Sequence, residues 1–165
     1  MIILGVDPGS VITGYAIIEK QKGQNICLKV IDFGCIVTDK YLTTGEKLKK
    51  INGDITKLIT KYRPDIMSIE TLFFFKNLKT VMPVSQTRGV ILLAAAEKKL
   101  PVLEFTPLQM KMAIAGYGRA EKKQVIEMIK KTINLDGFDL KKNNRKKDDA
   151  FDAIGMAICG AIKSY

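Results

Sequence analysis

The sequence predicts an α/β fold in which a mixed sheet of five strands is flanked by helices. The first three strand-like segments follow one another directly, as antiparallel strands do. The fourth and the fifth each come after a helical segment, as in parallel α/β units. The chain has 165 residues, of which 47% are hydrophobic, so residues 1–165 are expected to form one domain with a buried core.

The N-terminal half is expected to hold four of the strands and one helix. The first apolar, β-branched run leads into Asp7-Pro8-Gly9-Ser10, which is typical of a strand that ends in a turn. Apolar residues at helical spacing predict the helix, and Arg63-Pro64-Asp65 ends it. The last strand of this half ends at Glu70. The predicted order is strands at 2–6, 14–18 and 26–37, a helix at 48–62 and a strand at 66–69.

The C-terminal half is expected to hold four helices and one strand. An aromatic segment at 73–77 precedes it and is predicted to be a loop. Pro107 can open a helix, because its fixed φ suits the first turn, and Gly116 ends that helix. The polar, lysine-rich segment 134–147 predicts a second loop. The predicted order is a helix at about 82–99, a strand at 102–105, and helices at 107–115, 121–133 and 148–162.

The composition is basic and lacks histidine. Lysine and arginine number 27 against 17 acidic residues, a formal net charge of +10, which favours a polyanionic partner such as nucleic acid. Because histidine is absent, Ser-His-Asp and Cys-His nucleophile systems and His-ligated zinc are excluded. A general base must therefore be a carboxylate, lysine, tyrosine or water.

The cysteines and the apolar runs predict a cytoplasmic protein. Three cysteines occur without a CxxC pair, which is typical of reduced, mostly buried thiols in a reducing compartment. The N-terminus begins with a strand-like stretch that does not resemble a signal peptide. The apolar run 90–96 is far shorter than the roughly 18 residues of a membrane-spanning helix, so no membrane association is expected.

Acidic residues occur where predicted elements begin or end. Asp7 ends the first strand and Glu70 the fourth, so the two converge if these strands are parallel neighbours. Asp149 lies at the head of the apolar stripe of the last helix, and Asp152 follows on the adjacent face. Asp148 fits an N-cap, but it is also one turn before Asp152, so spacing alone leaves the choice between Asp148 and Asp149 open.

These four acids would form a site for hard cations if they meet. Close carboxylates repel one another unless a cation neutralises them, and oxygen-only ligation suits Mg²⁺ or Mn²⁺. Two such ions roughly 4 Å apart can clamp the attacking and leaving oxygens of a phosphodiester displacement. This interpretation predicts a metal-dependent nuclease. Spacing alone fits equally well with four unrelated caps and turns.

Several motifs, taken together, closely resemble the RuvC family of Holliday-junction resolvases. They occur in family order over nearly the whole chain. The matching stretches are Ile3-Leu4-Gly5-Val6-Asp7-Pro8-Gly9-Ser10 with Thr13-Gly14-Tyr15, Ile69-Glu70 with Phe73 and Lys76-Asn77, Gln86-Thr87-Arg88-Gly89-Val90, Gly118 with Ala120-Glu121-Lys122, and Asp149-Ala150-Phe151-Asp152-Ala153.

The resemblance implies a ribonuclease H-like fold and a homodimer that resolves four-way DNA junctions in recombination and repair. Each subunit would make one of two symmetric nicks, leaving 5'-phosphate and 3'-hydroxyl ends. The catalytic, metal-binding residues would be Asp7, Glu70, Asp149 and Asp152, which favours Asp149 over Asp148. The metal would be Mg²⁺, with Mn²⁺ as a substitute, at two ions per subunit.

The resemblance also implies DNA-binding residues and a protein partner. Phe73 matches an aromatic residue that stacks on bases near the crossover, although Phe74 or Phe75 could take its place. Basic and polar contacts to DNA are implied for Lys76, Asn77, Lys111 and Lys122. The implied protein partner is the RuvA–RuvB branch-migration complex.

Three other functions remain open from the residues. An ATP-binding protein of the actin and sugar-kinase type has a similar turn after its first strand, but it needs a second domain. A non-catalytic junction-binding protein would not need all four acids. A nuclease of the same fold with an RNA substrate is disfavoured by the match at Phe73 and Lys76-Asn77.

Overall fold

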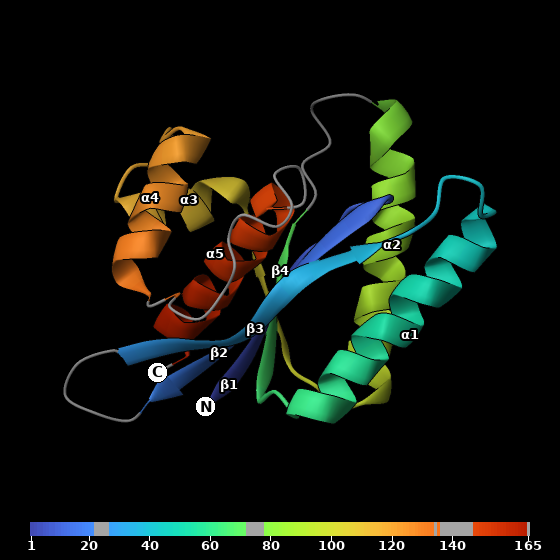
Figure 1. Cartoon of the computed structure of the whole chain (residues 1–165), viewed down its shortest axis with the longest axis horizontal. Helices are drawn as coiled ribbons and strands as arrows, with labels where there is room; N and C mark the ends of the chain where they lie inside the picture. The colour runs from blue at the N-terminus through green and yellow to red at the C-terminus, as the bar shows by residue number, and fades with distance from the viewer. Residues whose placement is uncertain (22–26, 72–77, 134, 136–146, 165) are drawn as a thin grey trace.

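The computed structural model describes residues 1–21, 27–71, 78–133, 135 and 147–164. Its centre is one five-stranded sheet with the strand order β3-β2-β1-β4-β5 (Figure 1). The strands are β1 (Ile2–Asp7), β2 (Ile12–Gln21), β3 (Cys27–Val37), β4 (Ile66–Glu70) and β5 (Val102–Phe105).

The pairing of the strands confirms the predicted mixed sheet. β1 pairs antiparallel with β2, and β2 pairs antiparallel with β3. On its other side β1 pairs parallel with β4, which in turn pairs parallel with β5. Because Val6 faces Ile69 in the parallel register, the carboxyl ends of β1 and β4 lie side by side.

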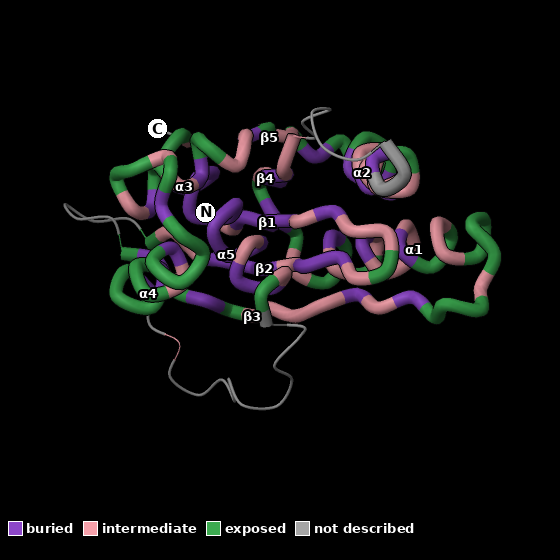
Figure 2. Tube along the Cα trace, turned by 90° about the horizontal axis from the view of Figure 1, so that it is seen from above, coloured by how far each residue is buried: buried purple, intermediate pink, exposed green. Residues whose placement is uncertain are grey.

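Helices cover both faces of the sheet. α1 (Thr44–Tyr62) and α2 (Leu78–Glu97) lie on one face, and α5 (Lys147–Lys163) lies on the other, with α3 (Pro107–Ala115) and α4 (Lys122–Thr132) beside it (Figures 1 and 2). Each face has its own apolar core of mainly isoleucine, leucine and alanine. Nearly every residue of α5 from 150 to 161 is buried, so this helix is the centre of its layer.

α1 begins four residues before its predicted start. Thr43 and Glu46 form a capping box, in which the Thr43 hydroxyl accepts from the Glu46 N–H and the Glu46 carboxylate accepts from the Thr43 N–H. The first turn therefore forms through polar capping, which an apolar pattern does not reveal. The helix ends at Arg63, whose left-handed backbone lets its N–H donate to the Ile59 carbonyl.

α2 and α5 also begin earlier than predicted. α2 starts at Leu78 and continues through Pro83, whereas the apolar pattern indicated a start near residue 82. α5 starts at Lys147, so the prediction that Asp148 is its N-cap is wrong, and Asp148 lies within the first turn. An acidic residue is favourable there because the helix dipole is positive at its N-terminus.

The cysteines are less buried than the sequence suggested. Cys159 is buried, Cys35 is half-buried and Cys27 is exposed at the start of β3. Among the helices of the described residues, none is both long and apolar enough to cross a lipid bilayer.

Candidate active site

Four carboxylates come from three elements that meet at one edge of the sheet. Asp7 is the last residue of β1 and Glu70 is the last residue of β4. Since these strands are parallel neighbours, both side chains emerge at the same edge, as the sequence predicted. Asp149 and Asp152 lie in the first two turns of α5, which packs on β1 and β2.

Two glycines let α5 approach the sheet closely enough to deliver its acids. A Cβ on Gly14 of β2 would lie 2.0 Å from the Asp149 carbonyl oxygen, and one on Gly5 of β1 would lie 2.1 Å from the Ala153 carbonyl oxygen. Real Cβ atoms do not reach such distances, so any side chain here would push the helix away. The backbone contact therefore sets the position of Asp149 relative to Asp7.

Burial is the main reason why the pKa values of all four carboxylates are raised, although the hydrogen bond with Asp7 lowers that of Glu70. Burial raises the pKa of Asp7 to about 8, with further contributions from the charges of Glu70, Asp152 and Asp149 and a hydrogen bond to Glu70. Burial also raises the pKa of Glu70, and the charge of Asp152 adds to this. The pKa values of Asp149 and Asp152 are raised mainly by burial. A cation bound among these carboxylates would favour their ionised forms.

Lys122, the first residue of α4, lies against this cluster. Its Nζ is 2.9 Å from Oδ2 of Asp152 and 3.6 Å from Oδ2 of Asp148. Burial lowers the pKa of Lys122, but the hydrogen bond and charge of Asp152 outweigh it and leave that pKa raised. Lys111 contributes a second positive charge near Asp152, whose pKa it lowers. Lys122 therefore contacts the acids, whereas Lys111 acts on Asp152 only through its charge.

The oxygen atoms of the four carboxylates suit a hard divalent cation, although their present positions do not form a complete binding site. The carboxylates offer only oxygen atoms, and burial together with neighbouring negative charge raises the pKa of Asp7 and of Glu70. As the side chains stand, no three acidic or cysteine residues in the described part of the chain are arranged to hold one ion. Lys122 occupies Oδ2 of Asp152, so it competes with a cation for that oxygen.

The fold decides which of Asp148 and Asp149 belongs to the carboxylate cluster, a choice that their spacing in the sequence left open. The charge of Asp149 raises the pKa of Asp7, whereas Asp148 is exposed and affects Asp152 and Lys122. The main chain of Asp149 also packs on Gly14, which pairs with Asp7, so Asp149 lies beside the end of β1. This placement agrees with the residue favoured by the family resemblance.

Arg88 on α2 is a site residue that the sequence reasoning did not single out. Its Nε donates to the main-chain carbonyl of Glu70 at 3.3 Å, and its Nη2 donates to Glu104 of β5. The guanidinium thus ties the end of β4 to the neighbouring strand. A signal was present, since Arg88 lies within the family-like stretch Gln86-Thr87-Arg88-Gly89-Val90, to which no role was given.

Several predicted DNA contacts lie outside the described residues. These are Phe73, Lys76 and Asn77, together with Phe74 and Phe75 and most of the lysine-rich segment 134–147. Their roles stay predictions.

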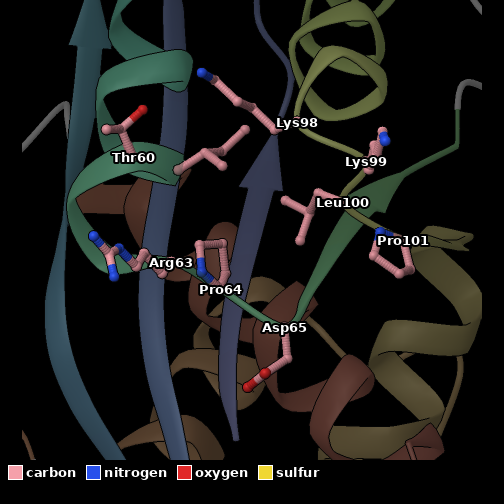
Figure 3. A pocket seen from close by; sticks show the side chains of 9 residues that line it. Thr60, Arg63, Pro64, Asp65, Lys98, Lys99, Leu100 and Pro101 are labelled. Carbon is pink, nitrogen blue, oxygen red and sulfur yellow. The ribbon is translucent and has the colours of Figure 1, made fainter.

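A basic cavity lies at the other end of the sheet. It has a volume of about 390 Å³ and is lined by Arg63, Pro64 and Asp65 before β4 and by Lys98 to Pro101 before β5. Arg63 and Lys99 lie on opposite sides of it (Figure 3), and both have left-handed backbones, with φ of 47° and 53°. The Arg63 N–H donates to the Ile59 carbonyl after α1, and the Lys99 N–H donates to the Ala96 carbonyl after α2. Because the cavity lies where β4 and β5 begin, it is separate from Asp7 and Glu70, which lie where their strands end.

Comparisons with known proteins match nearly the whole chain. The family described as crossover junction endodeoxyribonuclease RuvC matches residues 3–160. The protein of that name from Halothermothrix orenii is 49% identical over 159 residues, covering 96% of this chain and 91% of the relative. The one from Alkaliphilus metalliredigens is 48% identical over 165 residues, covering 100% of this chain and 95% of the relative.

The fold is also that of solved members. The structure of Thermus thermophilus RuvC superposes with a TM-score of 0.84 at 24% identity, covering 98% of this chain and 93% of that one. The same protein in complex with a Holliday junction substrate gives 0.82 at 22% identity, covering 98% of this chain and 93% of that one. These likenesses confirm the ribonuclease H-like architecture with its five-stranded mixed sheet. Because the match spans almost every element that builds the carboxylate site, the chain belongs to the RuvC family of crossover junction endodeoxyribonucleases.

Proposed function

We propose that this protein is a structure-specific endonuclease that resolves four-way DNA junctions in recombination and repair by metal-dependent hydrolysis. The observation that carries the proposal is the convergence of Asp7, Glu70, Asp149 and Asp152 at one sheet edge, in a member of this family. Burial and neighbouring negative charge raise the pKa of Asp7 to about 8, which supports a role for this cluster in binding a cation.

The mechanism follows from what each side chain can hold. Asp7, Glu70, Asp149 and Asp152 would bind Mg²⁺, or Mn²⁺ in its place, at two ions per subunit. Bound Mg²⁺ supplies water activation and stabilises negative charge on the phosphate oxygens. Asp7 would hold the metal in its ionised form. Lys122, which lies 2.9 Å from Asp152, would contact a non-bridging phosphate oxygen beside the acids.

The other parts of the proposal concern assembly and location. A homodimer with two-fold symmetry would present two identical sites for paired incisions, each leaving 5'-phosphate and 3'-hydroxyl ends. α2 suits the dimer surface, because Met82 and Leu93 on it are 65% and 52% exposed. DNA contacts are assigned to Phe73, Lys76, Asn77, Lys111 and Lys122. We also propose a cytoplasmic location and cooperation with the RuvA–RuvB branch-migration complex.

A synthetic four-way junction tests the function directly. The strands are labelled one at a time, and the protein is added with and without Mg²⁺. We expect nicks only with Mg²⁺, in opposing strands at symmetry-related positions, that DNA ligase seals. Unpaired or scattered nicks would indicate a general nuclease. Binding without cleavage at any Mg²⁺ or Mn²⁺ concentration would indicate a passive junction-binding protein.

A further inference from the structure

An exposed apolar patch lies beside the carboxylates and takes no part in the site described so far. It consists of Leu108 and Met112 on α3 and Tyr117 in the turn that follows, with exposures of 60%, 49% and 58%. A Cβ on Gly118 would lie 3.0 Å from Leu108 Cγ and 3.4 Å from Met112 Cγ, so the turn packs directly on those two side chains. Leu108 and Met112 therefore lie against the turn that carries the exposed Tyr117.

The surroundings of the apolar patch are basic. Residues 106–120 include Lys111 and Arg119 and no acidic residue. Lys111, between Leu108 and Met112 on α3, is close enough to Asp152 to lower the pKa of that acid. Lys122 follows the turn and lies 2.9 Å from Asp152. The patch is therefore bordered by cations on the side that faces the acids.

We propose that the apolar patch binds unstacked nucleotides of the cleaved strand, next to the scissile phosphate. The inference rests on the proposed function, because it needs a DNA strand at the carboxylates. An aromatic ring with apolar neighbours inside a basic surface is the combination on which proteins stack single-stranded bases, since the ring takes the base and the cations follow the phosphates. Lys111 and Lys122 would hold the phosphates on either side.

The charge argues against a second copy of the chain as the occupant. Two such surfaces would bring Lys111, Arg119 and Lys122 of each subunit against those of the other, and like charges across an interface are unfavourable. A nucleotide complements both the apolar patch and the cations beside it, because its base has an apolar face and its phosphate is anionic.

The test uses a four-way junction with 2-aminopurine placed on either side of the scissile phosphate, without divalent ions so that the DNA stays intact. We expect the fluorescence of the probe to change on binding to the parent protein and Tyr117→Phe, and to lose that change with Tyr117→Ala. Affinity should fall about tenfold for Tyr117→Ala combined with Leu108→Ser, as expected when a stacked base loses its platform. The slope of affinity against salt should stay the same, whereas Lys111→Gln should reduce it.

Met112→Ser and Met128→Ser form a matched pair. Met128 is an exposed methionine on α4 outside the patch, so only Met112→Ser should weaken binding. Parental affinity and probe signal in Tyr117→Ala with Leu108→Ser would overturn the inference, as would a change of oligomeric state in that variant. If the parent still makes paired nicks, such a result leaves the proposed function intact. If the parent neither binds nor cuts junctions, the proposed function itself fails.

Discussion

At the scale of single residues, Asp7 carries a conflict between stability and function. Its carboxyl is largely buried beside Glu70, and burial together with neighbouring negative charge raises its pKa to about 8. A carboxylate that ionises in such a place costs folding energy unless a cation binds. The same arrangement would be stabilised by a bound cation, as the proposed function requires.

Replacing Asp7 with Asn should separate cleavage from binding. The amide keeps the size of the side chain but removes a metal ligand, so the rate of junction cleavage should fall by at least about a hundredfold. Junction affinity should stay within about twofold, because the acid holds the cation and does not touch DNA. Single-turnover cleavage and gel-shift titration measure the two effects. Substantial Mg²⁺-dependent cleavage by this variant would contradict the assignment of Asp7.

The same variant should stabilise the protein when no metal is present. The folded-state pKa of Asp7 lies above its ordinary 3.8, so the native state binds more protons than the unfolded state between about pH 4 and pH 8. Stability should therefore fall as the pH rises through this range, and fall less in Asp7→Asn. With chelator present, we expect the melting temperature of the variant to exceed that of the parent by about 3 °C or more at pH 8 and less at pH 5. Parallel curves for the two proteins would show that Asp7 ionises without cost.

At the scale of elements, the contact between α5 and the sheet sets the site. Gly14→Ala would place a Cβ 2.0 Å from the Asp149 carbonyl oxygen, so α5 must move. We expect a loss of about 1–3 kcal/mol in the free energy of unfolding and a larger relative loss of cleavage. Gly53→Ala in α1 is the control, since its Cβ meets nothing within 4 Å and should be neutral or stabilising by about 0.5–1 kcal/mol. Equal effects of the two substitutions would contradict this role of Gly14.

Arg88 links α2 to the ends of β4 and β5, so it should act as a positioning residue for Glu70. Arg88→Gln removes the ion pair with Glu104 and weakens the hydrogen bond to the Glu70 carbonyl. We expect about a tenfold lower cleavage rate and a shift of the Mg²⁺ dependence to higher concentration, with unchanged junction affinity. Arg63→Gln, at the far end of the sheet, is the control. An unchanged Mg²⁺ dependence in Arg88→Gln would show that the contact is only structural.

At the scale of the whole molecule, the chain carries a formal net charge of +10, although its candidate active site is a small group of acids. Only four of the 27 basic residues are arginines, namely Arg63, Arg88, Arg119 and Arg145. Because lysine binds phosphate as a point charge and arginine suits base edges, this composition favours contacts to phosphates. Binding to the junction should therefore release counterions. We expect affinity to fall by about a thousandfold or more between 50 and 200 mM salt, as for roughly six or more phosphate contacts. Filter binding over this range measures the slope, and a flat response would exclude phosphate-dominated binding.

The sequence by itself determined which chemistry is available and where the strands run. Local periodicity and turns located all five strands, and the absence of histidine left carboxylates as the metal donors. The ends of the helices were predicted less well from the sequence, because the capping of α1 and the start of α5 depend on polar groups outside the apolar pattern.

Only the tertiary structure decided which acids meet. The distance between Asp7 and Asp149 along the chain says nothing about their separation in space, and the close approach at Gly14 depends on how α5 crosses β2. The contact of Arg88 with the ends of β4 and β5 likewise depends on neighbours from other elements, and so does the exposed surface near Tyr117 on which the further proposal rests. Local forces select the elements from sequence, whereas a site is made by long-range packing that brings their ends together.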